Sequence, residues 1–429
     1  MQTNHNPART GAWVLVAAAV LLLAVTMGSR TVFGLFISPL NSATGLGVAT
    51  ISFAIAVSQL TWGVAQPLVG VLAERHGAAR VIVAGSLLAA LASALLPFAD
   101  SAVLLVAVLA VSGIAATVGS PSLLVGTVSQ RVSAERRGLV VGIVGAGGPL
   151  GQLVLAPATQ AMISLAGWVT AAFSIAGLAL VALPLALAFR RRPASAAAVA
   201  QAAPQAGATL REALASRGFW LINATFFVCG LHVFFLVTHL PGVIELCGLP
   251  ASVAGLSLAV LGLFNIAGSI GAGWVIQRTS MKWTLAWLFA ARAAGIALFL
   301  AAPKTEMTVL AFSMWMGLTY MAVLPPTAGL IGKLYGTQRL PTLLGITFML
   351  HQVGAFLGSW LGGVFVEATG SYDGMWMLDL TLAIAAATLA LTIRERKEKK
   401  RASPYFFFFG RFLRAMRPEP QPTVTTPLP

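Results

Sequence analysis

The chain has 429 residues, of which 58% are hydrophobic and only 9% are charged, and its mean hydropathy is +0.88. A soluble domain carries roughly 25% charged residues, so this composition excludes a soluble enzyme and indicates a protein that crosses a membrane many times. The formal net charge of +15 does not indicate nucleic-acid binding, because most basic residues lie between apolar segments.

Twelve apolar segments follow one another along the chain, each long enough to cross a bilayer as a helix. In chain order they span about 13–38, 49–73, 80–98, 102–127, 139–164, 168–189, 219–241, 252–276, 284–302, 307–331, 342–366 and 374–393. The predicted fold is therefore an all-α membrane protein with twelve transmembrane helices.

The basic residues fall on one side of these segments. With the N-terminus inside, 24 of the 27 lysines and arginines lie in inner segments, and Lys304 alone lies in an outer loop. The other two, Arg30 and Arg292, lie within spans. Because loops that stay inside carry an excess of Lys and Arg, we expect both termini to be cytoplasmic. No organelle-targeting segment is evident, which favours a cell inner membrane.

The spans divide six and six. Residues 190–218, rich in alanine, proline and glutamine, predict a cytoplasmic linker. Identical residues recur at a constant offset of 203 positions, which indicates a duplication typical of transporters: Gly70 and Gly273, Gly142 and Gly345, Gly151 and Gly354, and Gly167 and Gly370. The predicted parts are an N-terminal half (1–189), the linker (190–218), a C-terminal half (219–393) and a basic cytoplasmic tail (394–429).

Three stretches resemble the major facilitator superfamily: SRTVFGLFISPL (29–40), WGVAQPLVGVLAERHG (62–77) and HQVGAFLGSWLGGVFVEATGSYDGMW (351–376). The loop after the second span is similar to that family's G-x-L-x-D-R-x-G-x-x-R pattern, with Glu74 in place of the usual Asp. Within the superfamily the chain looks most like the bacterial branch related to monocarboxylate and oxalate/formate transporters. The resemblance implies two pseudo-symmetric six-helix halves, with the first, fourth, seventh and tenth spans lining a central cavity.

Arg30 lies inside the apolar run VTMGSRTVFGLF (25–36), where a charge costs a few kcal/mol or more. Its guanidinium can hold a carboxylate through two hydrogen bonds, which predicts an anion anchor on a cavity helix. The alternative is a structural arginine that bonds helix carbonyls or reaches outward. We expect no acidic residue within the spans, and so a substrate as counter-ion, because the acidic residues of the second half fall in outer loops: Glu245, Glu306, Glu367 and Asp373.

Histidine is the side chain whose charge changes near physiological pH. His232 on the seventh span and His351 on the eleventh are therefore candidates for proton coupling or substrate contact, and His239 is a weaker one nearer the outer surface. The alternative for each is a neutral histidine that is hydrogen-bonded between helices.

Three further polar side chains lie within spans. Tyr320 on the tenth span is a candidate substrate contact or an interhelical hydrogen-bond donor. Gln59 is part of a polar and small-residue stripe that favours helix packing, and it is the member most suited to touch substrate. Arg292 lies on the ninth span, which the resemblance places at the periphery, so we expect a structural or lipid-facing charge.

The motif between the second and third spans predicts a cytoplasmic gate. Its charged side chains would bridge the two halves when the cavity opens outward and separate when it opens inward. The simpler alternative is that its arginines only reflect the positive-inside rule. The candidate gating residues are Gly70, Glu74, Arg75, Gly77 and Arg80.

The sequence thus predicts a secondary transporter of small organic anions, coupled to a proton or a counter-anion and working as a monomer. We expect no catalytic constellation, cofactor or metal site. Two other functions stay open: an exporter of drugs or hydrophobic compounds on the same fold, and a membrane sensor that binds ligand without transport. The basic and aromatic tail after residue 394 would lie on the inner leaflet or in solvent.

Overall fold

A computed structural model describes residues 7–129, 131–132, 137–190, 209–336 and 340–395, and all regular structure in these ranges is helical. The predicted tail lies outside the described residues, as does most of the linker. The helices are α1 (Pro7–Thr31), η1 (Phe33–Phe36), α2 (Ile37–Thr44), α3 (Val48–His76), α4 (Ala78–Leu95), η2 (Leu96–Phe98), α5 (Ala102–Ala116), η3 (Thr117–Gly119), α6 (Pro121–Ser129), α7 (Arg137–Gly145), α8 (Gly147–Leu185), η5 (Ala186–Phe189), α9 (Leu210–Ala215), α10 (Arg217–Leu246), α11 (Ala251–Val275), α12 (Met281–Ala301), α13 (Glu306–Thr319), α14 (Leu324–Tyr335), α15 (Leu340–Thr369) and α16 (Asp373–Thr392).

Eleven helical stretches in the described part of the chain are long and apolar enough to cross a membrane. One of them, Leu139–Phe189, has 51 residues, about twice the length that a bilayer requires. It turns at Gly167, whose φ of +84° is left-handed backbone that glycine adopts without strain. This stretch therefore supplies two spans, which brings the number to twelve and confirms the predicted fold of a multi-pass membrane protein.

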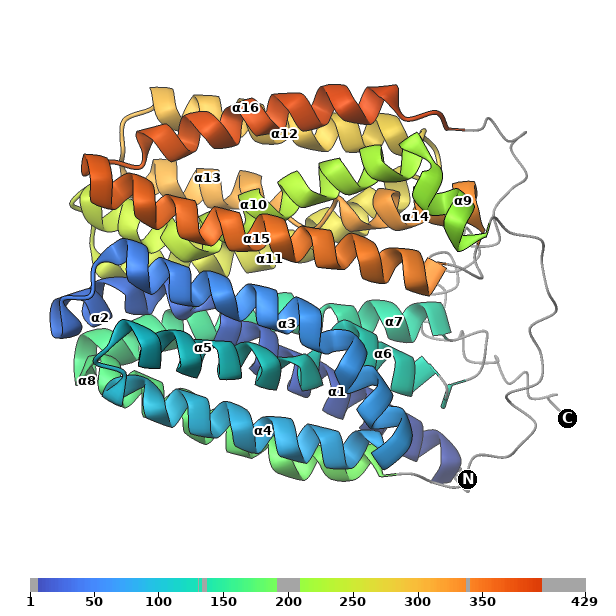
Figure 1. Cartoon of the computed structure of the whole chain (residues 1–429), viewed down its shortest axis with the longest axis horizontal. Helices are drawn as coiled ribbons and strands as arrows, with labels where there is room; N and C mark the ends of the chain where they lie inside the picture. The colour runs from blue at the N-terminus through green and yellow to red at the C-terminus, as the bar shows by residue number, and fades with distance from the viewer. Residues whose placement is uncertain (1–6, 130, 133–136, 191–208, 337–339, 396–429) are drawn as a thin grey trace, which may run out of the picture. The chain divides into compact units, whose positions relative to one another are not determined.

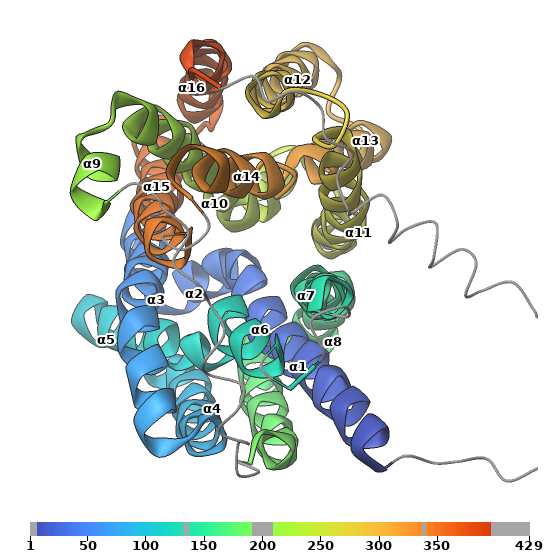
Figure 2. The same cartoon turned by 90° about the vertical axis from the view of Figure 1, so that its right-hand side faces the viewer.

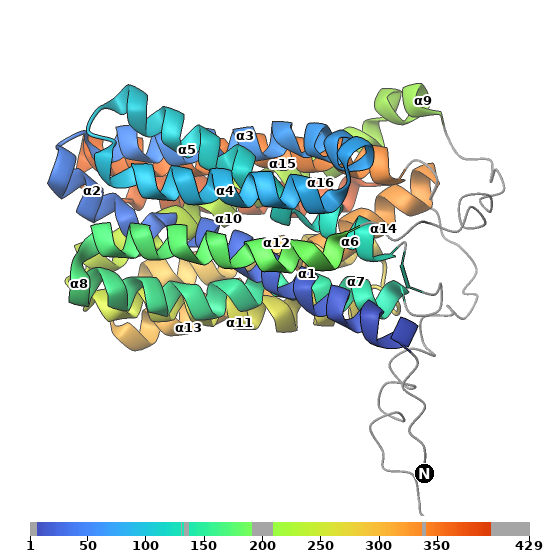
Figure 3. The same ribbon diagram turned by 90° about the horizontal axis from the view of Figure 1, so that it is seen from below.

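The helices form two groups, α1–α8 and α9–α16, which lie on opposite sides of the view in Figure 2. All long helices run roughly along one direction (Figures 1 and 3). We call the end on the right of Figure 1 the basic face, because helix ends there carry Arg75, Arg80, Arg190, Arg217, Arg278, Lys282 and Lys333. We call the opposite end, which holds the turn at Gly167 and Lys304, the far face.

Helices are interrupted at equivalent positions in the two groups. α5 ends at Ala116 and α13 ends at Thr319, which are separated by the same 203 positions that the sequence repeat shows. Each break is followed by a helix with proline in its first turn, α6 at Pro121 and α14 at Pro325, where the missing N–H costs nothing. The fourth and tenth spans are therefore interrupted at equivalent places in the two halves.

Glycine contacts repeat in the same way. A Cβ atom on Gly151 of α8 would lie 2.0 Å from the carbonyl oxygen of Ala24, and one on Gly354 of α15 would lie 2.1 Å from that of Phe227. Gly151 and Gly354 are 203 positions apart in the sequence, and so are their contact residues Ala24 and Phe227. Small residues thus let the fifth span approach the first, and the eleventh approach the seventh, to backbone contact. The glycine-rich fifth span serves helix packing.

This packing predicts that replacing one of these glycines with a bulky side chain strongly destabilises the protein. Gly354→Leu forces α15 away from the backbone of α10, so we expect loss of the monodisperse peak in size-exclusion chromatography and a lower midpoint of thermal unfolding. Gly345→Leu on the same helix is the matched control, because a Cβ there has nothing within 4 Å. Equal behaviour of the two variants would contradict the close contact.

Candidate functional site

Arg30 lies near the end of α1, just before the chain tightens into η1. Its side chain is only 7% exposed. Nη2 donates a hydrogen bond to Oε1 of Gln59 on α3, and Nη1 lies 3.9 Å from Sδ of Met27. Among the described residues, no carboxylate lies within ion-pair distance of Arg30. The guanidinium is thus a buried cation held by neutral partners.

Two aromatic rings lie close to this cation. The Arg30 Cζ atom lies 4.1 Å from the ring centroid of Trp62 on α3 and 5.9 Å from that of Phe234 on α10. Such contacts attract a cation through the ring quadrupole and strengthen when water is excluded. Phe234 belongs to the C-terminal group, so Arg30 lies where the two halves meet.

The same Phe234 ring connects Arg30 to His351. The two rings have centroids 6.3 Å apart, and His351 also packs on Phe226 at 4.7 Å. His351 is 2% exposed, and its Nε2 has no hydrogen-bond partner, like Nε1 of Trp62 and Oε1 of the neighbouring Gln352. Buried polar atoms are rarely left unpaired, so these three have capacity for further hydrogen bonds, to a ligand or to water. We call Arg30, Gln59, Trp62, Phe234 and His351 the Arg30 cluster.

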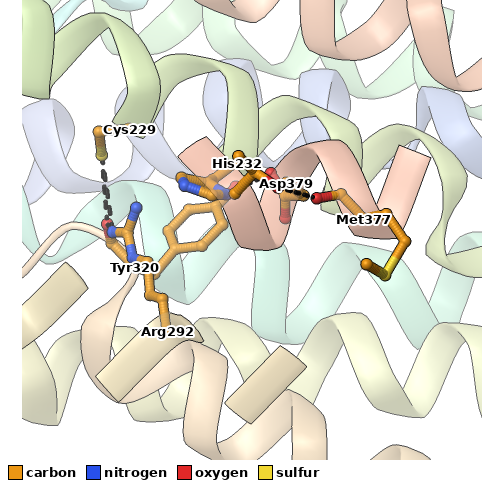
Figure 4. A network of polar contacts seen from close by, with 7 residues as sticks. Cys229, His232, Arg292, Tyr320, Met377 and Asp379 are labelled. Carbon is orange, nitrogen blue, oxygen red and sulfur yellow. Dashed lines mark hydrogen bonds and ion pairs between the residues drawn. The ribbon is translucent and has the colours of Figure 1, made fainter. Parts of the chain in front are cut away.

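His232 lies elsewhere, in a second group of buried charges on the C-terminal half (Figure 4). It is 1% exposed at the middle of α10, and its Nδ1 lies within ion-pair distance of Oδ1 of Asp379 on α16. The two atoms are close, but their geometry is not that of a hydrogen bond. Asp379 is itself 1% exposed and lies within the last span, which corrects the expectation that the spans hold no acidic residue.

Arg292 belongs to this second group. It is 1% exposed on α12, and its Nη2 donates to the carbonyl oxygens of Thr319 and Tyr320, each at 2.5 Å. These carbonyls end α13, where the helix dipole favours a cation. Arg292 therefore faces the protein interior at the break of the tenth span, not lipid. We call His232, Asp379, Arg292 and the Tyr320 carbonyl the Asp379 network.

Two polar residues make bonds between helices. The Tyr320 hydroxyl donates to the carbonyl oxygen of Val233, 3.3 Å away, so of its two predicted roles the structure contains the interhelical bond. His239 Nε2 lies 2.7 Å from the carbonyl oxygen of Ser359, and its Nδ1 lies 3.3 Å from the Tyr372 hydroxyl. His239 is a fully buried histidine whose two ring nitrogens both have partners.

The predicted gating residues lie together at the basic face. Gly70 and Glu74–His76 are in the last turns of α3, Gly77 turns the chain with a φ of +89°, and Arg80 is in the first turn of α4. Glu74, Arg75 and Arg80 are exposed. The structure places this motif at the surface, away from both buried clusters.

Comparison with known proteins identifies the family. The sequence profile of the Major Facilitator Superfamily matches residues 19–338 and 272–420. The chain belongs to the Major Facilitator Superfamily. Its similarity to an inward-facing, occupied structure of a bacterial homologue of the human lysosomal transporter Spinster has a TM-score of 0.70. That match covers 91% of this chain and 95% of the other at 13% identity, which shows the fold alone.

Curated relatives of this superfamily member are transporters. An uncharacterized MFS-type transporter of Bacillus subtilis, YcxA, is 27% identical over 82% of this chain and 88% of its own. Monocarboxylate transporter 13 of Rattus norvegicus is 26% identical over 89% of this chain and 88% of its own. The oxalate:formate antiporter of Oxalobacter formigenes is 25% identical over 91% and 94%, respectively. These matches bear out the family resemblance that the sequence motifs indicated.

Proposed function

We propose that this superfamily member is a secondary transporter of small organic anions, with monocarboxylates as the substrate class. The observation that carries the proposal is Arg30, a buried cation at the junction of the two halves that no described carboxylate neutralises. A carboxylate would accept two hydrogen bonds from its guanidinium, with Gln59 released or shared. The aromatic rings of Trp62 and Phe234 would contact the apolar part of the acid.

One positive charge in the Arg30 cluster favours an acid with one negative charge. Burying a second carboxylate without a partner would cost several kcal/mol. Monocarboxylate transporter 13 points in the same direction by its name, and the oxalate:formate antiporter is named for one monocarboxylate, formate, beside the dicarboxylate oxalate. His351 and Gln59 are the polar groups best placed to help select the substrate.

Alternating access is supported by where the halves touch. Glu367 of α15 accepts a hydrogen bond from the backbone N–H of Ala49, and Glu245 accepts one from the hydroxyl of Ser38, both at the far face. Near the middle, a Cβ on Gly63 would meet the Gln352 side chain. We assign this state as closed at the far face. In the alternate state, the Glu74–Arg80 motif would bridge the halves as the basic face closes.

The test is uptake of labelled carboxylates into proteoliposomes, with formate, lactate, oxalate and benzoate as the panel and protein-free liposomes as the control. We expect the acids with one carboxylate to be taken up and to compete with one another, and oxalate to compete poorly. Uptake of amphiphilic cations or neutral drugs in place of the acids would support an exporter. Ligand binding without any uptake would support a sensor.

Orientation in the membrane follows from the basic face, which the positive-inside rule places in the cytoplasm. Half-buried Cys247 then faces outward, and fully buried Cys229 is protected. We expect a membrane-impermeant maleimide to label Cys247 on intact cells, with Cys247→Ser as the control.

Burial raises the pKa of the Cys247 thiol, and the positive charge of Lys304 opposes this rise in part. Because the thiolate is the reactive form, the labelling rate should rise about tenfold per pH unit. This rise should continue to a pH above the usual pKa of a thiol. If Cys247 were labelled only in permeabilised cells, the far face would be cytoplasmic and the assigned orientation would be wrong.

A further inference from the structure

The Asp379 network places charges where the fold does not require them. At the 203-position offset, His232, Arg292 and Asp379 correspond to Ser29, Ala89 and Ala176 in the first half. There the N-terminal half encloses a small cavity of about 30 Å³, whose lining includes Ser29, Ala89 and the neighbouring Arg30. One half therefore folds with small side chains at the positions that carry three titratable or charged groups in the other.

The charges of this network balance only in one protonation state. With a neutral His232, the positive Arg292 and the negative Asp379 sum to zero. Adding one proton converts the histidine and carboxylate to an imidazolium–carboxylate pair and leaves a net charge of +1. Because buried charges without compensation are costly, the network holds a proton best when another negative charge enters the protein.

Few other titratable groups face the pair. α10 contributes Cys229, whose thiol lies 3.6 Å from Arg292 Nη2, and the break after α13 contributes Tyr320. From α15, His351 contacts α10 at Phe226, and α11 carries no titratable residue. His232 Nε2 has no hydrogen-bond partner, so this nitrogen is available to accept the proton.

The network is attached to the interrupted tenth span and to the Arg30 cluster. Arg292 holds the carbonyls that end α13, and the Tyr320 hydroxyl bonds Val233, next to His232 in sequence. Phe234, one residue further along α10, faces Arg30. Three consecutive residues of α10 thus connect the charge pair, the break and the anion anchor.

We propose that the His232–Asp379 pair is the proton-binding site of this transporter and that it takes up one proton with each monocarboxylate. The anion neutralises Arg30 and the proton charges the network, so a loaded protein differs from an empty one by no net charge. Transport is then electroneutral, driven by a pH gradient and indifferent to membrane potential. This inference rests on the proposed function.

His232→Gln is the sharpest test, because a neutral amide keeps the charge balance between Arg292 and Asp379 and so favours folding. Asp379→Asn is the second variant, and Asp373→Asn, an exposed carboxylate at the start of the same helix, is the matched control. Two assays are compared: net uptake driven by an inward proton gradient, and exchange of labelled for unlabelled lactate at equal pH on both sides.

We expect His232→Gln and Asp379→Asn to lose at least about tenfold of gradient-driven uptake while keeping exchange, since exchange needs no net proton movement. Asp373→Asn should match the wild type in both assays. Gradient-driven uptake retained by His232→Gln and Asp379→Asn, or wild-type uptake that ignores the gradient, would overturn the pair as the proton site. Absence of all carboxylate uptake and exchange in the wild type would instead remove the proposed function itself.

Discussion

Replacing Arg30 with glutamine is expected to reduce carboxylate uptake by about 30-fold or more while leaving the protein folded. Removing one partner of a buried, hydrogen-bonded charge pair costs about 2–5 kcal/mol of binding, and each 1.4 kcal/mol is about tenfold. Folding should survive because Arg30 has no described carboxylate that the substitution would leave unpaired. The measurement is initial uptake rate against substrate concentration in proteoliposomes, beside the thermal unfolding midpoint in detergent.

Two comparisons sharpen this result. Arg217→Gln makes the same chemical change at an exposed position on the basic face and should leave uptake unchanged. Arg30→Lys keeps the charge but offers no planar fork, so intermediate uptake is expected. Full carboxylate uptake by Arg30→Gln would contradict the anion anchor and assign Arg30 a structural role.

Removing Arg292 should instead destabilise the protein. Arg292→Met leaves two helix-end carbonyls without their donor and removes the positive charge from the Asp379 network, which together cost about 3–5 kcal/mol. The double variant Arg292→Met/Asp379→Asn removes both charges. We expect it to be more stable than the sum of the single losses predicts, by about 1–3 kcal/mol, because the two residues belong to one network.

Thermal unfolding followed by the monodisperse fraction in size-exclusion chromatography measures these differences. Arg292→Met/Asp373→Asn is the matched double variant, since exposed Asp373 is not part of the network and its effect should simply add to that of Arg292→Met. Strict additivity in both double variants would mean that Arg292 and Asp379 do not share a charge balance.

The fold was predictable because its causes are periodic and local. Length and apolarity mark the spans, and Gly167 and Gly370 mark equivalent turns, which both have positive φ in the structure. Gly151 and Gly354, which the 203-residue offset pairs, make equivalent close contacts in the structure, since duplicated halves use small residues at the same contacts. Breaks such as the one after Thr319 were not foreseen, because each half of the span is apolar by itself.

The site was predictable only in part. Arg30 was found because it interrupts an apolar run, and Asp379 gives the same signal within the last span but was overlooked there. The pairing of Arg30 with Gln59, and of His232 with Asp379, joins residues that are far apart in the chain. Such pairings depend on how helices rotate about their axes in the bundle, which a single sequence does not specify.

Arg292 shows the same limit. A structural or lipid-facing arginine was expected on the ninth span because that span is peripheral. One face of the helix nevertheless points inward, and there Arg292 reaches the end of α13. A peripheral helix is not peripheral on every side. Helix rotation, not helix order, decides which residues enter the interior.

The far-face contacts have a consequence for the rate of the cycle. Glu367 and Glu245 bond a backbone N–H and a serine hydroxyl, and neither makes an ion pair within the described residues. A hydrogen bond to a charged group contributes about 1.5–3 kcal/mol, less where water competes. Two such hydrogen bonds are few enough for thermal motion to break them. In the proposed cycle, a substrate would shift the balance between the two open forms only by as much as it binds one form more tightly than the other.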